Sequence, residues 1–164
     1  MTEHKNVSED ELKEVLGEDF ISISLRPSTL KHRLQRLSAV LARMNGEESE
    51  TKRSELEQHL VPSLFSKELM HHKSGELGLV LACCYADLCR IYAPSSPTDN
   101  ETMIIEMFSL MWEQLEGLKQ TNKGKQEQED DMDNNYPLAF RILESLSAYL
   151  SFVLLFNCKK GFQL

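Results

Sequence analysis

The sequence lacks the features that mark several classes of protein. Its first thirty residues hold seven acids and no uninterrupted apolar run, so no secretory or transit peptide is expected. Basic residues are outnumbered, with 18 Lys and Arg against 26 Asp and Glu, and the net charge of −8 gives no overall field that would attract nucleic acid or an anionic membrane. A chain of 164 residues with 41% hydrophobic content suits one compact domain, in the cytosol or nucleus.

Catalytic and cofactor motifs are also missing. The sequence contains no phosphate-binding loop, nucleophile elbow or H-E-x-x-H zinc motif. Its four cysteines do not form the spaced framework of a secreted domain, which favours a reducing compartment. The spacing of Cys83, Cys84 and Cys89 is not that of zinc ligands, and the adjacent His71 and His72 diverge. We therefore expect core thiols in place of a metal or nucleophilic site, no cofactor and no enzyme activity.

The most apolar stretch runs from Leu77 to Tyr92, where thirteen of sixteen residues are apolar and only Asp87 and Arg90 are charged. A helix that is apolar nearly all round must be enclosed by other helices. At about 1.5 Å per residue it is too short for a membrane core of about 30 Å, so we predict a buried central helix. Its predicted core residues are Leu81, Cys83, Cys84, Leu88 and Ile91.

Other helices are predicted on both sides of this one. Ser8 and Glu11 have capping-box spacing before a short helix that ends near Leu16. Leucines at 30, 34, 37 and 41 mark one face of a helix over 28–43, and its arginines fall on the other face. That basic face could meet DNA phosphate, but neutralisation by nearby acids is the favoured interpretation. Further helices are predicted over 49–69, bent by Pro62, and over 99–118.

The C-terminal part contrasts a polar segment with an apolar one. Residues 119–135 are almost devoid of apolar side chains and include five acids between Glu127 and Asp133, which predicts a mobile loop. A helix is expected from Pro137 to about Asn157, with proline in its first turn. Apolar residues from Phe152 to Phe156 cover the circumference of that helix, so we expect something to pack on its outer side and predict self-association through it.

No strand-like alternation has a partner elsewhere in the sequence, and helix pairs of this size are typical of stacked helical arrays. The predicted fold class is all-α, with HEAT-like antiparallel helical hairpins stacked as a short α-solenoid. The expected organisation is an acidic N-terminal segment over 1–27, HEAT-like helices over 28–118, a mobile loop over 119–135, an apolar helix over 136–157 and a tail over 158–164.

The segment ACCYADLCRIYAPSSP, which begins at Ala82, resembles the signature of the precocious-dissociation-of-sisters family of cohesin regulators. Three positions depart from the family pattern: Gly78 replaces an arginine, Tyr85 an aliphatic residue and Ser96 an alanine. The resemblance implies a non-catalytic HEAT-repeat scaffold in the nucleus, associated with chromatin and acting on sister chromatid cohesion. Family members are several times longer than this chain.

The proline-bracketed loop is the predicted partner-binding site. Two prolines fix much of a short loop, which displays its backbone and an aromatic residue between two helices. The resemblance implies that Tyr92, Ala93, Pro94 and Pro97 bind short motifs of the wings-apart-like release factor and related regulators, and that the cohesin kleisin subunit is a further partner. The alternatives are a generic α-helical adaptor unrelated to cohesin, or a non-functional truncated relative.

Overall fold

The computed structural model describes residues 7–17, 19–44, 50–72, 75–121, 129–148 and 153–158. Within these residues the regular structure is entirely helical and contains no strand, which confirms the predicted all-α class. The elements are α1 (Glu9–Val15), α2 (Pro27–Arg43), α3 (Glu50–Glu55), the π-helix η1 (Leu56–Leu60), α4 (Val61–Leu64), α5 (Lys67–Met70), α6 (Gly75–Tyr92), α7 (Glu101–Thr121), α8 (Glu129–Ala148) and α9 (Val153–Asn157).

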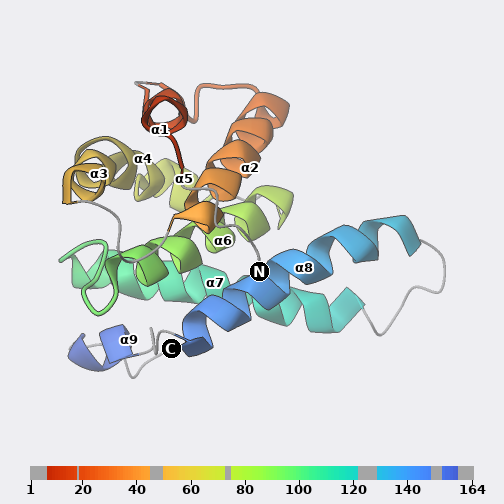
Figure 1. Ribbon diagram of the computed structural model, residues 1–164. Helices are drawn as coiled ribbons and strands as arrows, with labels where there is room; N and C mark the ends of the chain where they lie inside the picture. The colour runs from red at the N-terminus through yellow and green to blue at the C-terminus, as the bar shows by residue number, and fades with distance from the viewer. Residues whose placement is uncertain are drawn as a thin grey trace, which may run out of the picture.

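Helix α6 lies at the centre of the fold. It packs against α2 on one side and against α7 and α8 on the other, as Figure 1 shows. From residue 77 to residue 92 every position except Arg90 is buried. The predicted core residues are all at most 2% exposed: Leu81, Cys83, Cys84, Leu88 and Ile91. The prediction of a buried central helix is confirmed. None of the described helices combines the length and apolar character needed to cross a membrane.

The N-terminal helices follow the sequence pattern. The Ser8 side chain accepts a hydrogen bond from the Glu11 amide at 3.2 Å and so caps α1. The four leucines that mark the inner face of α2 are at most 1% exposed: Leu30, Leu34, Leu37 and Leu41. On the opposite face, Arg36 pairs with Glu14 at 2.6 Å and Arg43 pairs with Glu11. Acids of α1 therefore neutralise Arg36 and Arg43, in agreement with the favoured interpretation of the basic face.

The segment from α3 to α4 bends where proline was expected to act. Proline lacks an amide hydrogen, and its ring clashes with the carbonyl four residues earlier in a regular α-helix. A wider π-helical turn, η1, ends two residues before Pro62, and the Val61 amide bonds to the Leu56 carbonyl five residues back. Leu56, Leu60 and Leu64 still turn inward and are buried.

The C-terminal boundaries differ from the prediction. The loop expected over 119–135 is helical at both ends, because α7 continues to Thr121 and α8 begins at Glu129. Counting apolar residues underestimated the extent of both helices, because the backbone hydrogen bonds of a helix do not require apolar side chains. Pro137 lies inside α8, not in its first turn. Of the helix expected to run to Asn157, the structure describes α8 as far as Ala148 and α9 from Val153, and residues 149–152 lie outside the described residues. Residues 122–128, and Asn45 and Gly46 after α2, lie outside the described residues.

Candidate partner-binding groove

The loop between α6 and α7, residues 93–100, is held by local hydrogen bonds. The Ser95 amide donates to the Tyr92 carbonyl at 2.8 Å, and the Thr98 amide donates to Ser96 Oγ at 3.4 Å. The Asn100 side chain then caps α7 by accepting from the amides of Thr102 and Met103, at 3.0 and 3.3 Å. The chain therefore leaves one long helix and enters the next through a short, ordered connection.

The four residues predicted to bind partners do not share one exposed edge. Pro94 is exposed and Ala93 is half-buried, whereas Pro97 is buried and Tyr92 is only 5% exposed. The Tyr92 hydroxyl donates to the Arg53 carbonyl at 3.1 Å, and burial raises the pKa of Tyr92. The expectation that Tyr92 is displayed is wrong, because its ring completes the buried face of α6. Tyr92 and Pro97 anchor the loop, and Pro94 is its outermost predicted residue.

A cavity of about 590 Å³ lies between this loop and the segment formed by α3 and η1. We call it the loop groove. Its lining residues are Glu50, Arg53, Ser54, Glu57, Tyr92, Ser95 and Ser96. Four of these come from α3 and η1 and were not predicted as site residues. Their spacing of three, one and three residues places polar side chains on one helical face, and this pattern was the signal in the sequence that could have identified them.

The loop groove is polar and carries both signs of charge. Glu50 and Glu57 are exposed, whereas Arg53 and Ser54 are half-buried. After burial, the Glu57 carboxylate is the next cause that raises the pKa of Tyr92, and Arg53 lowers it. Such a lining offers hydrogen-bond acceptors and charged groups to an extended peptide.

A buried ionic cluster links α6 to α2 and α8. Asp87, only 2% exposed, accepts hydrogen bonds from Arg90 at 3.3 Å and from Arg141 of α8. Burial raises the pKa of Asp87, and the guanidinium groups of Arg141 and Arg90 act in the opposite direction. Arg90 also donates to the Leu41 carbonyl at 2.7 Å, and Arg141 to Ser38 Oγ at 2.8 Å. One carboxylate of α6 thereby ties α2 and α8 together.

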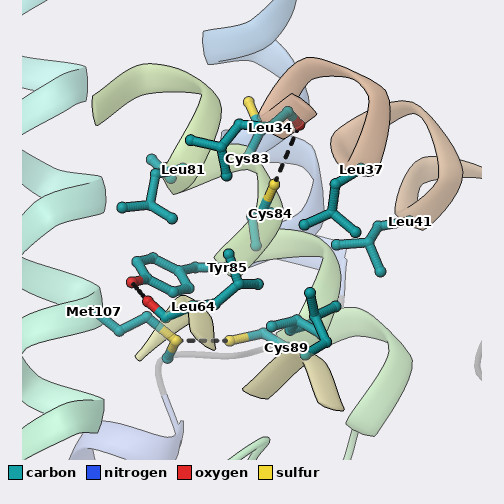
Figure 2. Packing of buried hydrophobic residues seen from close by; sticks show 14 of the residues in the cluster. Leu34, Leu37, Leu41, Leu64, Leu81, Cys83, Cys84, Tyr85, Cys89 and Met107 are labelled. Carbon is teal, nitrogen blue, oxygen red and sulfur yellow. Dashed lines mark hydrogen bonds between the residues drawn. The ribbon is translucent and has the colours of Figure 1, made fainter. Parts of the chain in front are cut away.

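The thiols of α6 lie in the core, as predicted (Figure 2). Cys84 Sγ lies 4.0 Å from the Leu34 carbonyl oxygen, and Cys89 Sγ lies 3.9 Å from the Met107 sulfur. Burial raises the pKa of Cys89, and likewise that of Cys83, to about 12. Thiols with such pKa values are poor nucleophiles at neutral pH. In the described part of the chain, no three His, Cys, Asp or Glu side chains are arranged to hold a metal ion.

The fold is a helical scaffold with a polar groove at the end of its central helix. The family model described as "Sister chromatid cohesion protein PDS5 protein" matches residues 28–164. The chain therefore belongs to the PDS5 family of sister chromatid cohesion proteins.

Similarity to curated relatives and to a solved structure supports the same family assignment. The human sister chromatid cohesion protein PDS5 homolog B is 36% identical over 67 residues, which are 41% of this chain and 5% of the relative. Homolog B-B of Xenopus laevis is 34% identical over 77 residues, covering 47% of this chain and 5% of the relative. The PDS5 homolog A of Danio rerio is 36% identical over 58 residues, covering 35% and 4%.

A chain in the solved structure of the Pds5–Scc1 complex aligns with 87% of this chain and 19% of its own length, at a TM-score of 0.69 and 26% identity. This likeness confirms the predicted HEAT-like α-solenoid. The matched segments are small shares of the relatives, about one twentieth of the curated proteins.

Proposed function

We propose that this chain is a non-catalytic scaffold that takes part in regulating cohesin and sister chromatid cohesion, in the nucleus and on chromatin. The observation that carries the proposal is the family match over residues 28–164. That match also disfavours the alternative of a generic helical adaptor from another pathway. A scaffold acts through its surfaces, and we propose the loop groove as one that recognises a partner.

The proposed partners are the cohesin kleisin subunit and the wings-apart-like release factor. The kleisin is supported by the structural neighbour, a Pds5 chain from a complex with Scc1. For the release factor we propose binding of a short extended motif in the loop groove, beside Pro94. The support is the ordered loop with its polar cavity of about 590 Å³, together with the family resemblance of the loop sequence.

The groove assignment can be tested by fluorescence polarisation with a labelled release-factor peptide. Reversing two exposed charges in the groove, with Glu50→Lys and Glu57→Lys together, should weaken binding about tenfold or more, because both side chains line the cavity and neither lies in the core. The matched control reverses two exposed acids elsewhere, Glu113→Lys with Glu144→Lys, and changes the net charge equally. Equal loss in both double variants would show a general charge effect and reject the groove.

Substitution of Tyr92 by alanine is a poor test of this site. Its ring is buried and its hydroxyl bonds to α3, so the variant would disturb the fold and the groove together. Pro94→Gly is a better loop variant, because Pro94 is exposed. It should weaken peptide binding while circular dichroism shows unchanged helix content.

We further propose weak self-association through α9. Val153 and Phe156 are 52% and 63% exposed, while Leu154 and Leu155 between them pack against the core. Exposed apolar side chains of this size favour association. The charge of −8 opposes it at low salt, so sedimentation velocity should show more dimer as salt is added. Val153→Ser with Phe156→Ser should leave a monomer at all concentrations, and an unchanged dimer would place the contact elsewhere.

A further inference from the structure

One residue of the loop groove offers a chemistry that recognition alone does not use. Ser96 is the one serine or threonine in the sequence that is followed by proline, here Pro97. A Ser-Pro pair is the minimal recognition sequence of proline-directed protein kinases. These kinases can select proline at the position after the serine because proline has no amide hydrogen. The pair lies in a connecting loop and not within a helix.

The position of Ser96 makes modification consequential. Its side chain lines the loop groove and is half-buried, next to the exposed Ser95. The Ser96 hydroxyl oxygen already accepts a hydrogen bond from the Thr98 amide at 3.4 Å. A phosphate on the same oxygen would bring stronger acceptors to that amide, which lies three residues before α7.

The charges of the groove decide what such a phosphate would do. Glu50, Arg53 and Glu57 line the same cavity, with formal charges that sum to −1. A phosphoserine adds a charge of about −1.5 to −2 at neutral pH. The cavity would become strongly acidic. The phosphate would also fill part of the cavity, on the side formed by the loop. A peptide seated there would lose room and would lose access to Arg53.

We propose that Ser96 is a phosphorylation site of a proline-directed serine/threonine kinase, and that its phosphate occupies the loop groove and displaces the bound peptide. Ser96 Oγ forms the new bond to the γ-phosphorus of ATP, the bond to the bridging β,γ-oxygen breaks, ADP leaves, and the hydroxyl proton passes to the kinase base. The displacement rests on the proposed function of the groove, whereas the modification itself does not.

The first experiment maps the modification on the folded full chain. The protein is incubated with a proline-directed kinase and ATP, and phosphate is located by mass spectrometry. Phosphate should appear at Ser96 in the native chain, persist in the Ser95→Ala variant and vanish in Ser96→Ala. Because Pro97 is buried, the same reaction is also run, as a comparison, on chain that has been unfolded in urea and then diluted into the kinase mixture. Modification of the unfolded chain alone would overturn the proposal.

The second experiment tests where the phosphate lies. The Thr98 amide resonance should move on phosphorylation of the native chain and stay in place in kinase-treated Ser96→Ala. In fluorescence polarisation the phosphorylated chain should bind the release-factor peptide about tenfold or more weakly than the unmodified chain. Unchanged affinity, or an unmoved Thr98 resonance, would overturn occupation of the groove. If the peptide does not bind even the unmodified chain, the proposed function of the groove is rejected. The phosphate mapping and the Thr98 resonance then still test whether Ser96 is modified and where its phosphate lies.

Discussion

The buried ionic cluster gives the sharpest stability prediction. Asp87→Asn keeps the size of the side chain and removes its charge, which leaves Arg90 and Arg141 without their common anionic partner. Removing one partner of a buried ion pair costs about 3–5 kcal/mol. The two arginine side chains are 13% and 25% exposed, and asparagine still offers an acceptor, so we expect the lower end, about 3 kcal/mol.

Urea unfolding of the unmodified chain and the Asp87→Asn variant measures this difference directly, provided that the slope of the unfolding free energy against urea concentration is the same for both. The matched control is Glu14→Gln, which removes the exposed pair with Arg36, whose side chains are 52% and 48% exposed. That change should cost at most about 1 kcal/mol. If Asp87→Asn costs no more than the control, the cluster is not what holds α2 and α8 on α6.

Three further predictions concern α6. Since burial raises the pKa values of Cys83 and Cys89 from an ordinary 9.0 to about 12, the unfolded chain loses these thiol protons first, and the free energy of unfolding should fall as pH rises from 9.0 to about 12; a flat profile over that range would contradict their burial. Gly78→Ala should stabilise the chain by up to about 1 kcal/mol through helix propensity and so raise the melting temperature slightly, because the atoms nearest the added methyl group, from 2.7 Å, belong to the end of the flexible Gln114 side chain; a large loss of stability would mean that Gln114 cannot move aside. Tyr92→Phe should destabilise the chain by about 1 kcal/mol in urea, because one hydrogen bond to an α3 carbonyl is lost, and no change would show that bond to be unimportant.

The sequence predicted the centre of the fold well because burial leaves a strong signal. A run of apolar residues from Leu77 to Tyr92 admits few structures other than an enclosed helix, and the α2 leucines recur at helical spacing. The C-terminal boundaries were harder to predict. The described part of α8 starts at Glu129, in a polar stretch with too few apolar residues to show helical periodicity, and Pro137 is accommodated inside the helix.

The candidate site was predicted only in part. The loop at Pro94 and Pro97 is visible in the sequence because prolines end helices. The orientation of this loop cannot be read from the sequence, because nothing in the residues around Tyr92 indicates that its hydroxyl reaches a carbonyl 39 residues away. The opposite wall of the groove, from Glu50 to Glu57, comes from a segment whose distance from the loop is set by the packing of η1 and α4.

The central claim, a cohesin-binding scaffold that uses the loop groove, is tested most directly by one pull-down. Tagged chain is incubated with nuclear extract, and the captured material is probed for the cohesin kleisin and the release factor. The unmodified chain should retain both, and the double variant Glu50→Lys with Glu57→Lys should lose the release factor while the Glu113→Lys, Glu144→Lys control keeps it. Retention of neither protein by the unmodified chain would contradict the account.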